Sequence, residues 1–106
     1  MAARSYVVDI AGGTATATIQ MQATQTLKNL LLSWVNAAAG KIELSTSGTS
    51  QIGTAQPDTN VIARASVSAG ANQTVTNIPI RLPVKAFQSI YIHCTGAGNL
   101  GTAVLS

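Results

Sequence analysis

The sequence predicts an all-β protein: a single-domain antiparallel β-sandwich of about eight short strands, with the jelly-roll as its expected form. Short runs of alternating apolar and polar residues recur along the chain, and turn residues separate them at fairly even spacing. β-Branched residues are frequent within the runs. With 106 residues the chain suits one domain, residues 1–106, built around one core.

The first two strands are predicted from alternation alone. In Ser5–Ile10 one face carries Tyr6, Val8 and Ile10, and Gly12-Gly13 marks the turn that follows. Thr14–Gln22 alternates more regularly, because its odd positions are apolar and its even positions are polar. The apolar face consists of Ala15, Ala17, Ile19 and Met21. The opposite face bears no charge, and we interpret it as a contact surface formed by Thr14, Thr16, Thr18, Gln20 and Gln22.

The segment Leu27–Ala39 fits two structures. A helix would align Leu27, Leu30, Leu31, Trp34, Val35 and Ala38, with Thr26 as its N-cap and Gly40 as its C-cap residue. A strand is also consistent, since Leu30, Leu32 and Trp34 alternate, and Lys41–Ser45 follows as a second strand. Because the rest of the chain has β patterns, we favour a hairpin that turns through Asn36–Gly40.

The second half predicts a long loop, Thr46–Thr59, followed by four strands. The strands are Asn60–Val67, Gln73–Leu82, Ser89–Thr95 and Thr102–Leu105. In the second of them Val75 is out of phase with Ile78, which predicts a bulge near Asn77, and Pro79 indicates an edge strand or that same bulge. Glycines at 96, 98 and 101 would supply the left-handed angles of a closing hairpin.

The composition indicates a subunit that packs against other proteins. Only 8% of the residues are charged, against about 25% in ordinary soluble domains, while 46% are hydrophobic. The six basic residues are scattered singly, so we expect no electrostatic footprint for nucleic acid. The start of the chain lacks the apolar core of a signal peptide, and no apolar stretch approaches about 18 residues, so we also expect no membrane span.

Few residues could carry chemistry. His93 is the only histidine, and its neighbour Cys94, the only cysteine, would point to the opposite face of the same strand. The chain therefore cannot form an internal disulfide, and its three acidic residues, Asp9, Glu43 and Asp58, have no metal-ligand spacing. We expect no catalytic, cofactor-binding or metal-binding residue, unless a pocket holds His93 beside one of the acids.

Two further patterns have alternative readings. Gly96–Gly101 spells G-x-G-x-x-G, but it connects two strands, where a dinucleotide site needs a strand followed by a helix, so we interpret it as a turn. Trp34 and Tyr91 could stack on a sugar, which makes a carbohydrate-binding or adhesin module the alternative function, with the 46–59 loop as part of its site. For Trp34, anchoring of the core is the favoured use.

Four segments in combination resemble small all-β virion proteins of tailed bacteriophages, of the capsid decoration (cement) type and related minor structural subunits. They are Gly12–Gln22, Leu32–Trp34, Gly40–Ser45 and Pro83–Gly96, which together sample most of the chain. The resemblance implies a non-enzymatic subunit, a homotrimer by preference, that bridges major capsid proteins and strengthens the shell. It also implies a location in the virion, assembled in the host cytoplasm, and the alternative module would belong to a phage tail or fibre.

Overall fold

The protein is all-β. The computed structural model describes residues 4–11, 16–35, 39–53, 59–67, 73–96 and 100–106, and within these ranges the chain forms eight strands and no helix. Within the same ranges, therefore, no helix is available to cross a membrane. The strands are β1 (Tyr6–Ala11), β2 (Thr16–Gln20), β3 (Gln25–Val35), β4 (Gly40–Ser45), β5 (Val61–Val67), β6 (Gln73–Val84), β7 (Ser89–Cys94) and β8 (Leu100–Leu105).

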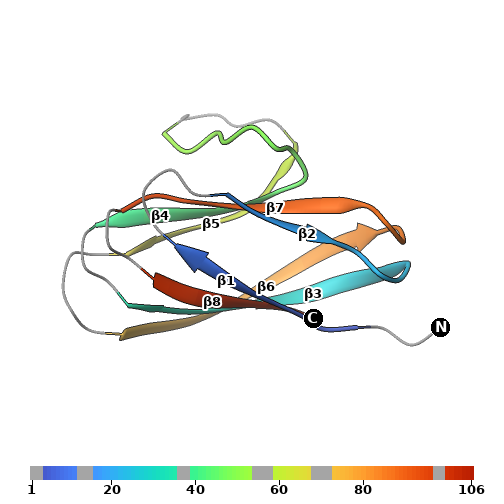
Figure 1. The fold of residues 1–106 in the computed structure, drawn as a ribbon, viewed down its shortest axis with the longest axis horizontal. Coiled ribbons are helices and arrows are strands. Elements are labelled where there is room, and N and C mark those ends of the chain that lie inside the picture. The colour runs from blue at the N-terminus through green and yellow to red at the C-terminus, as the bar shows by residue number, and fades with distance from the viewer. Residues whose placement is uncertain (1–3, 12–15, 36–38, 54–58, 68–72, 97–99) are drawn as a thin grey trace.

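The strands form two antiparallel four-stranded sheets packed face to face, which confirms the predicted β-sandwich (Figure 1). Sheet A has the order β1-β8-β3-β6, and sheet B has the order β2-β7-β4-β5. The pairings are nested: β4 pairs with β5, β3 with β6, β2 with β7, and β1 with β8. The strands nearest the two ends of the chain thus lie side by side.

Both expected hairpins are wrong, although their strands are present. β3 belongs to sheet A and β4 to sheet B, and in the same way β7 and β8 belong to different sheets. The connections after β3 and β7 therefore cross from one sheet to the other. Alternation in a sequence reports which side chains face the core, and it does not report which strand is the neighbour, because strands of either sheet can face the same core.

The core lies between the two sheets and follows the alternation predicted for the first strands. Tyr6 and Ile10 of β1 are buried, as are Ile19 of β2 and Met21 just after it, while the Thr and Gln positions of β2 are exposed. The two sheets contribute mainly aliphatic side chains and one indole. The remaining core members are Leu27, Leu30, Leu32, Trp34, Ile42, Leu44, Leu82, Val84, Ile90, Ile92, Cys94, Ala103 and Leu105.

A bulge in β3 explains why this segment resembles a helix in sequence. The N–H groups of Lys28 and Asn29 both donate to the carbonyl of Ser106, at 2.7 and 3.0 Å, so two residues of β3 face one residue of the partner strand. Leu27 and Leu30 are therefore both buried, three residues apart, which is a helical spacing. The strand alternative for this segment is confirmed.

β6 is an edge strand, as Pro79 indicated. Its register against β3 shifts between the pairs Leu27–Leu82 and Asn29–Pro79. The bulge predicted near Asn77 is wrong in position, because Asn77 pairs regularly with Leu31. The irregularity lies beside the proline, where the missing N–H already interrupts the ladder.

Candidate functional site

A row of polar side chains crosses the outer face of sheet B. The strand registers place Thr16 opposite His93, His93 opposite Glu43, and Glu43 opposite Arg64, so the row runs through β2, β7, β4 and β5. His93 is 2% exposed and Glu43 is fully buried. A buried polar side chain is stable only when it has hydrogen-bonding partners. The residues that cover this row and bond to it therefore indicate its role.

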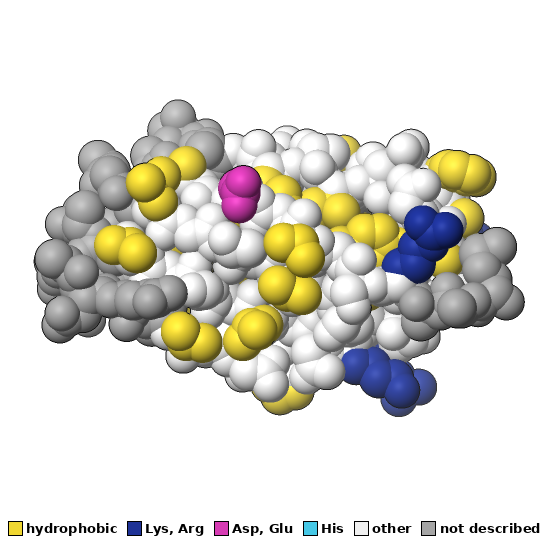
Figure 2. Space-filling model, turned by 60° about the horizontal axis from the view of Figure 1, so that its bottom comes forward, with side chains coloured by type: hydrophobic (Ala, Val, Ile, Leu, Met, Phe, Trp, Pro, Cys, Tyr) yellow, Lys and Arg dark blue, Asp and Glu magenta, His cyan; other side chains and the backbone are white. Residues whose placement is uncertain are grey.

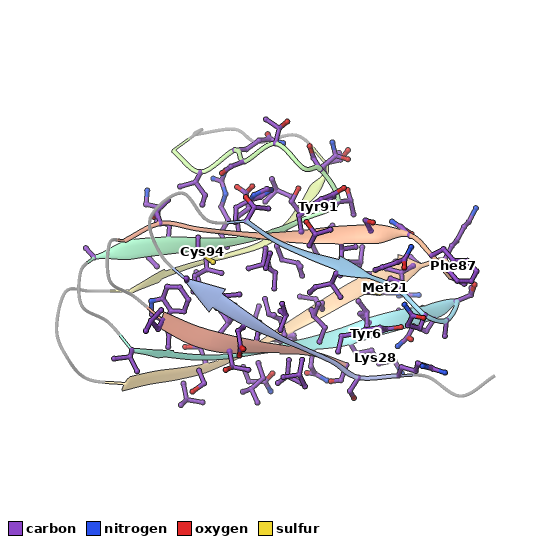
Figure 3. The ribbon with its side chains drawn as sticks, viewed as in Figure 1. Tyr6, Met21, Lys28, Phe87, Tyr91 and Cys94 are labelled. Atoms are coloured by element: carbon purple, nitrogen blue, oxygen red, sulfur yellow. The ribbon has the colours of Figure 1, made fainter. Side chains whose placement is uncertain are left out.

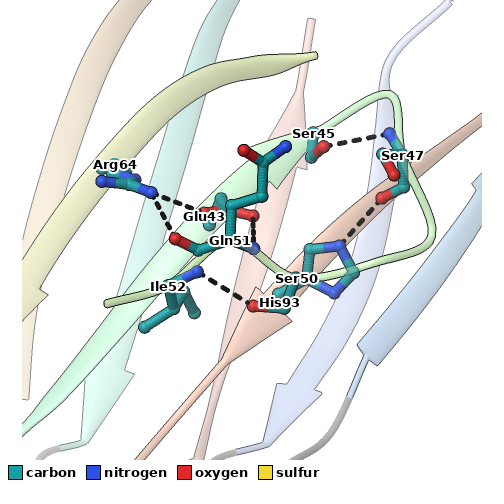
Figure 4. A network of polar contacts seen from close by, with 8 residues as sticks. All are labelled: Glu43, Ser45, Ser47, Ser50, Gln51, Ile52, Arg64 and His93. Carbon is teal, nitrogen blue, oxygen red and sulfur yellow. Dashed lines mark hydrogen bonds and ion pairs between the residues drawn. The ribbon is translucent and has the colours of Figure 1, made fainter. Parts of the chain in front are cut away.

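The cover is the first part of the long loop, residues 46–53, which folds back over sheet B (Figures 1 and 4). The carboxylate of Glu43 accepts the backbone N–H of Gln51 at 3.0 Å and lies 3.3 Å from the guanidinium of Arg64. Arg64 also donates to the Gln51 carbonyl. The N–H and the carbonyl of Gln51 are thus both hydrogen-bonded to the ion pair that Glu43 of β4 forms with Arg64 of β5. Residues 54–58, with Asp58, lie outside the described part of the chain.

His93 is a second anchor of the same loop. Its Nε2 is 2.9 Å from the carbonyl oxygen of Ser47, and its Nδ1 is 3.0 Å from the hydroxyl oxygen of Thr16. A carbonyl can only accept, so Nε2 carries the proton that it donates, and Nδ1 then accepts from the Thr16 hydroxyl. Both ring nitrogens are engaged within the protein.

His93 and Glu43 do not line the hollow nearest to the loop. A hollow of about 330 Å³ opens beside the loop, but neither residue lines it. Its walls are Lys41, Ile42, Ile52, Gly53, Arg64, Ala65 and Ser66. Asp9 lies on β1 of sheet A, whereas His93 lies on β7 of sheet B. Within the described ranges, no group of three His, Cys, Asp or Glu residues is placed to hold a metal ion. We interpret the polar row as a clamp that fixes the loop.

Cys94 faces away from His93, as the alternation predicted, and packs in the core at 3% exposure. Burial raises the pKa of its thiol from the ordinary value of 9.0 to about 11, because the charged thiolate is poorly solvated there. The thiol is therefore protonated at neutral pH and behaves as a small apolar side chain.

The two aromatic residues that support the carbohydrate-binding alternative are not displayed together. Trp34 is 1% exposed and anchors the core, as favoured above, so its ring is not available to stack on a sugar. Tyr91 is half-buried: its ring lies parallel to that of His93, with centroids 6.2 Å apart, and it faces the loop at Gly48. Trp34 therefore gives that alternative no support, and the ring of Tyr91 is partly covered.

The glycine-rich segment connects β7 to β8, as predicted, but its glycines have different roles. Gly96 has a φ of 103°, the left-handed angle expected of a turn, and residues 97–99 lie outside the described part. Gly101 is instead a strand residue of β8 opposite Trp34. A Cβ at Gly101 would lie 2.6 Å from Cε3 of the indole and would also collide with the carbonyl oxygen of Ser33. This glycine makes room for the core tryptophan.

The outer face of sheet A carries several exposed apolar side chains among polar ones (Figure 2). Val7 is 69% exposed, Leu100 61% and Val75 64%, and they lie on three different strands. The registers place Val7, Val104 and Leu31 in one row across the sheet, and Leu100 and Val35 in another. We call this surface the A-face and define it by Val7, Leu31, Val35, Val75, Leu100 and Val104.

An open hollow lies on the A-face at the end where β8 begins. Its volume is about 480 Å³, and its lining consists of Asp9, Ile10, Ser33, Val35, Leu100, Gly101 and Thr102. Asp9 is exposed at this rim and accepts a long hydrogen bond of 3.5 Å from the Thr102 hydroxyl. The hollow is therefore mainly apolar with one carboxylate.

The turn between β6 and β7 presents Phe87 at the far end of the molecule (Figure 3). The ring is 71% exposed, and the backbone has a φ of 70°, which costs roughly 1–2 kcal/mol for a residue other than glycine. Hydrogen bonds hold this conformation: the N–H of Phe87 donates to the Met21 carbonyl, and that of Met21 donates to the Gln88 carbonyl. The N–H groups on either side bind Thr24 Oγ1 and Lys85 O.

Sequence reasoning missed the A-face and the Phe87 turn. The A-face had a visible signal, because Val7 falls on the opposite face from Tyr6 and Ile10, and an apolar residue there contradicts a solvated surface. The conformation of Phe87 had no signal in the sequence, since nothing in Lys85-Ala86-Phe87 indicates a left-handed backbone angle. The uncharged Thr and Gln row on β2 stays a predicted contact surface.

The comparisons with known proteins add no relative. No protein-family model, curated protein or solved structure gives a significant match to this chain.

Proposed function

We propose that the protein is a non-enzymatic structural subunit of a bacteriophage virion, a capsid decoration (cement) protein that binds and stabilises a shell of major capsid proteins. The observation that carries the proposal is the A-face, an exposed apolar sheet surface on a chain with very few charges. The resemblance of the sequence to decoration-type proteins supplies the kind of partner. No cofactor or metal is part of the proposed role.

The composition of the A-face supports assembly by burial of apolar surface. Complete burial of a valine or leucine side chain is worth about 1.5–3 kcal/mol, so a patch of this size can bind without ion pairs. The strands of sheet A carry three exposed charged residues, Asp9, Lys28 and Arg81, so docking that leaves these three at its edge requires little desolvation of charge. Such a surface is typical of a subunit contact rather than of a solvated sheet.

The proposal includes the jelly-roll form. We interpret the nested pairing, in which β4–β5 is innermost and β1–β8 is outermost, as a long hairpin rolled into two sheets, which is how a jelly-roll is built. This arrangement leaves both outer faces available in principle. The 46–53 loop covers part of sheet B, which leaves the A-face as the open one.

The test is co-sedimentation with shells of major capsid protein. The purified chain should bind, should raise the temperature at which the shells break, and should lose both effects when Leu31→Lys places a charge at the centre of the A-face. Ser66→Lys, at an exposed position of β5 on the other sheet, is the matched control and should bind normally. A wild-type chain that binds no shell, or a Leu31→Lys chain that binds as wild type does, would contradict the proposal.

A further inference from the structure

We propose that copies of this chain join head to tail, with the Phe87 turn of one copy inserted into the hollow of the A-face of the next copy. The inference rests on the proposed function in taking the chain to be an assembling subunit. It goes further by assigning the two surfaces that join the copies, and by leaving the rest of the A-face, around Val7, Leu31 and Val104, to the shell.

The Phe87 turn has the properties of an inserting anchor. Its ring is exposed, and the four consecutive N–H groups from Lys85 to Gln88 are all hydrogen-bonded, so the backbone of the turn is fixed and projects the side chain outward. A strained residue persists where surrounding contacts over-determine it, and such residues concentrate at functional sites. An aromatic side chain has only two rotatable bonds and therefore loses little conformational entropy when it is buried in a partner.

The hollow complements this turn in apolar character and in charge. It is an open, mainly apolar depression of about 480 Å³, and the apolar side chains of Val35 and Leu100 are part of its lining. Its rim carries the carboxylate of Asp9, while the Phe87 turn carries the exposed Lys85 two residues before the ring. An inserted Phe87 would therefore bring Lys85 of one copy towards Asp9 of the next.

The two surfaces lie at opposite ends of the molecule, so a contact between them is not self-complementary. β8 begins at the left-hand end of the molecule and Phe87 lies at the right-hand end, along a longest dimension of 41 Å (Figures 1 and 3). A contact between two different surfaces is heterologous, and copies joined in this way close into a ring or extend as a filament. A ring of three copies agrees with the homotrimer that the resemblance to decoration proteins implies.

The first experiment measures mass in solution by analytical ultracentrifugation. The wild-type chain should give a species near three times 10.8 kDa. Phe87→Asn should give a monomer, yet its thermal unfolding midpoint should not fall, because asparagine tolerates the left-handed angle. Phe87→Tyr keeps the ring and should keep the assembly. A wild-type monomer at every concentration, or a Phe87→Asn chain that assembles normally, overturns the inference.

Mixing two defective variants tests the head-to-tail geometry. Phe87→Asn lacks the inserting ring but keeps the hollow, and Thr102→Lys fills the hollow but keeps the ring. Each variant alone should be monomeric, and the mixture should form a dimer with one chain of each kind. Charge reversal adds a check: Asp9→Lys and Lys85→Asp should each weaken assembly several-fold, and the double variant should recover it. A mixture that stays monomeric, or a double variant weaker than both single ones, argues against this pairing.

Shell binding separates failure of the inference from failure of the proposed function. Leu31→Lys should remain a trimer while losing the shell. Phe87→Asn should bind the shell at least 100-fold more weakly, because a monomer lacks the avidity of three linked sites. If Leu31→Lys loses the shell and Phe87→Asn binds it like the wild type, the proposed function stands and the inference falls.

Discussion

Residue 101 has no room for a side chain, because Trp34 and the Ser33 carbonyl occupy the space that a Cβ would take. We expect Gly101→Ala to lower the free energy of unfolding by about 1–3 kcal/mol, the usual range for an overpacked core. Urea denaturation would measure the change. Gly48→Ala is the control, since its nearest contact, 3.6 Å from the Tyr91 ring, is ordinary van der Waals distance. Equal midpoints for both variants would contradict this account of Gly101.

The raised pKa of the Cys94 thiol leads us to expect that the free energy of unfolding falls at high pH. Its pKa is about 11 in the folded protein and near the ordinary 9.0 in the unfolded chain. Between these two values the unfolded chain releases the thiol proton while the folded chain keeps it, so stability is intact below pH 9 and falls as pH rises, by at most about 1.4 kcal/mol per pH unit. The slope of unfolding free energy against pH should be shallower in Cys94→Ala. Identical slopes from pH 9 to 10.5 would refute the argument.

At the scale of elements, the clamp couples the 46–53 loop to sheet B. Arg64→Ala would leave the carboxylate of Glu43 buried without its cation, and we expect a loss of about 1–3 kcal/mol, moderated because the Arg64 side chain is 35% exposed. The loop should also become more sensitive to limited proteolysis. Arg81→Ala, at an exposed position of β6, should change neither property.

The double variant Glu43→Gln with Arg64→Ala distinguishes an unpaired charge from lost packing. It removes the carboxylate together with the guanidinium, so it should be more stable than Arg64→Ala alone. A double variant that is less stable than Arg64→Ala would show that the ion pair is not the source of the loss.

The elements also show how far sequence reasoning reaches. Alternation identified the inner faces of Tyr6–Ile10 and Ile19–Met21, because facing the core is a local property of a strand. It could not separate helix from strand at Leu27–Leu30, because the bulge imposes a helical spacing on a strand. It also missed the polar row, since Glu43, Arg64 and His93 meet only through registers between strands distant in sequence.

For the whole molecule, low charge implies assembly that is insensitive to salt. Apolar burial is maintained or strengthened by salt, whereas exposed charges are screened as the Debye length falls from about 10 Å at 0.1 M to about 3 Å at 1 M. One rim pair such as Asp9 with Lys85 is worth at most about 1 kcal/mol. The fraction of protein that sediments with shells should therefore change little over this range. Release of the protein at high salt would mean that its scattered Arg and Lys residues hold it there.

The place of β8 in sheet A has a consequence for synthesis. β8 is the last of the eight strands in chain order, yet it lies between β1 and β3. While the chain is still emerging from the ribosome, those two strands cannot pair through it, and each presents an unsatisfied backbone edge beside apolar side chains. Such edges recruit other strands, including those of neighbouring nascent chains. We therefore expect the nascent chain to be most prone to aggregation just before β8 leaves the ribosome. A chaperone that binds nascent chains would be most effective at that stage.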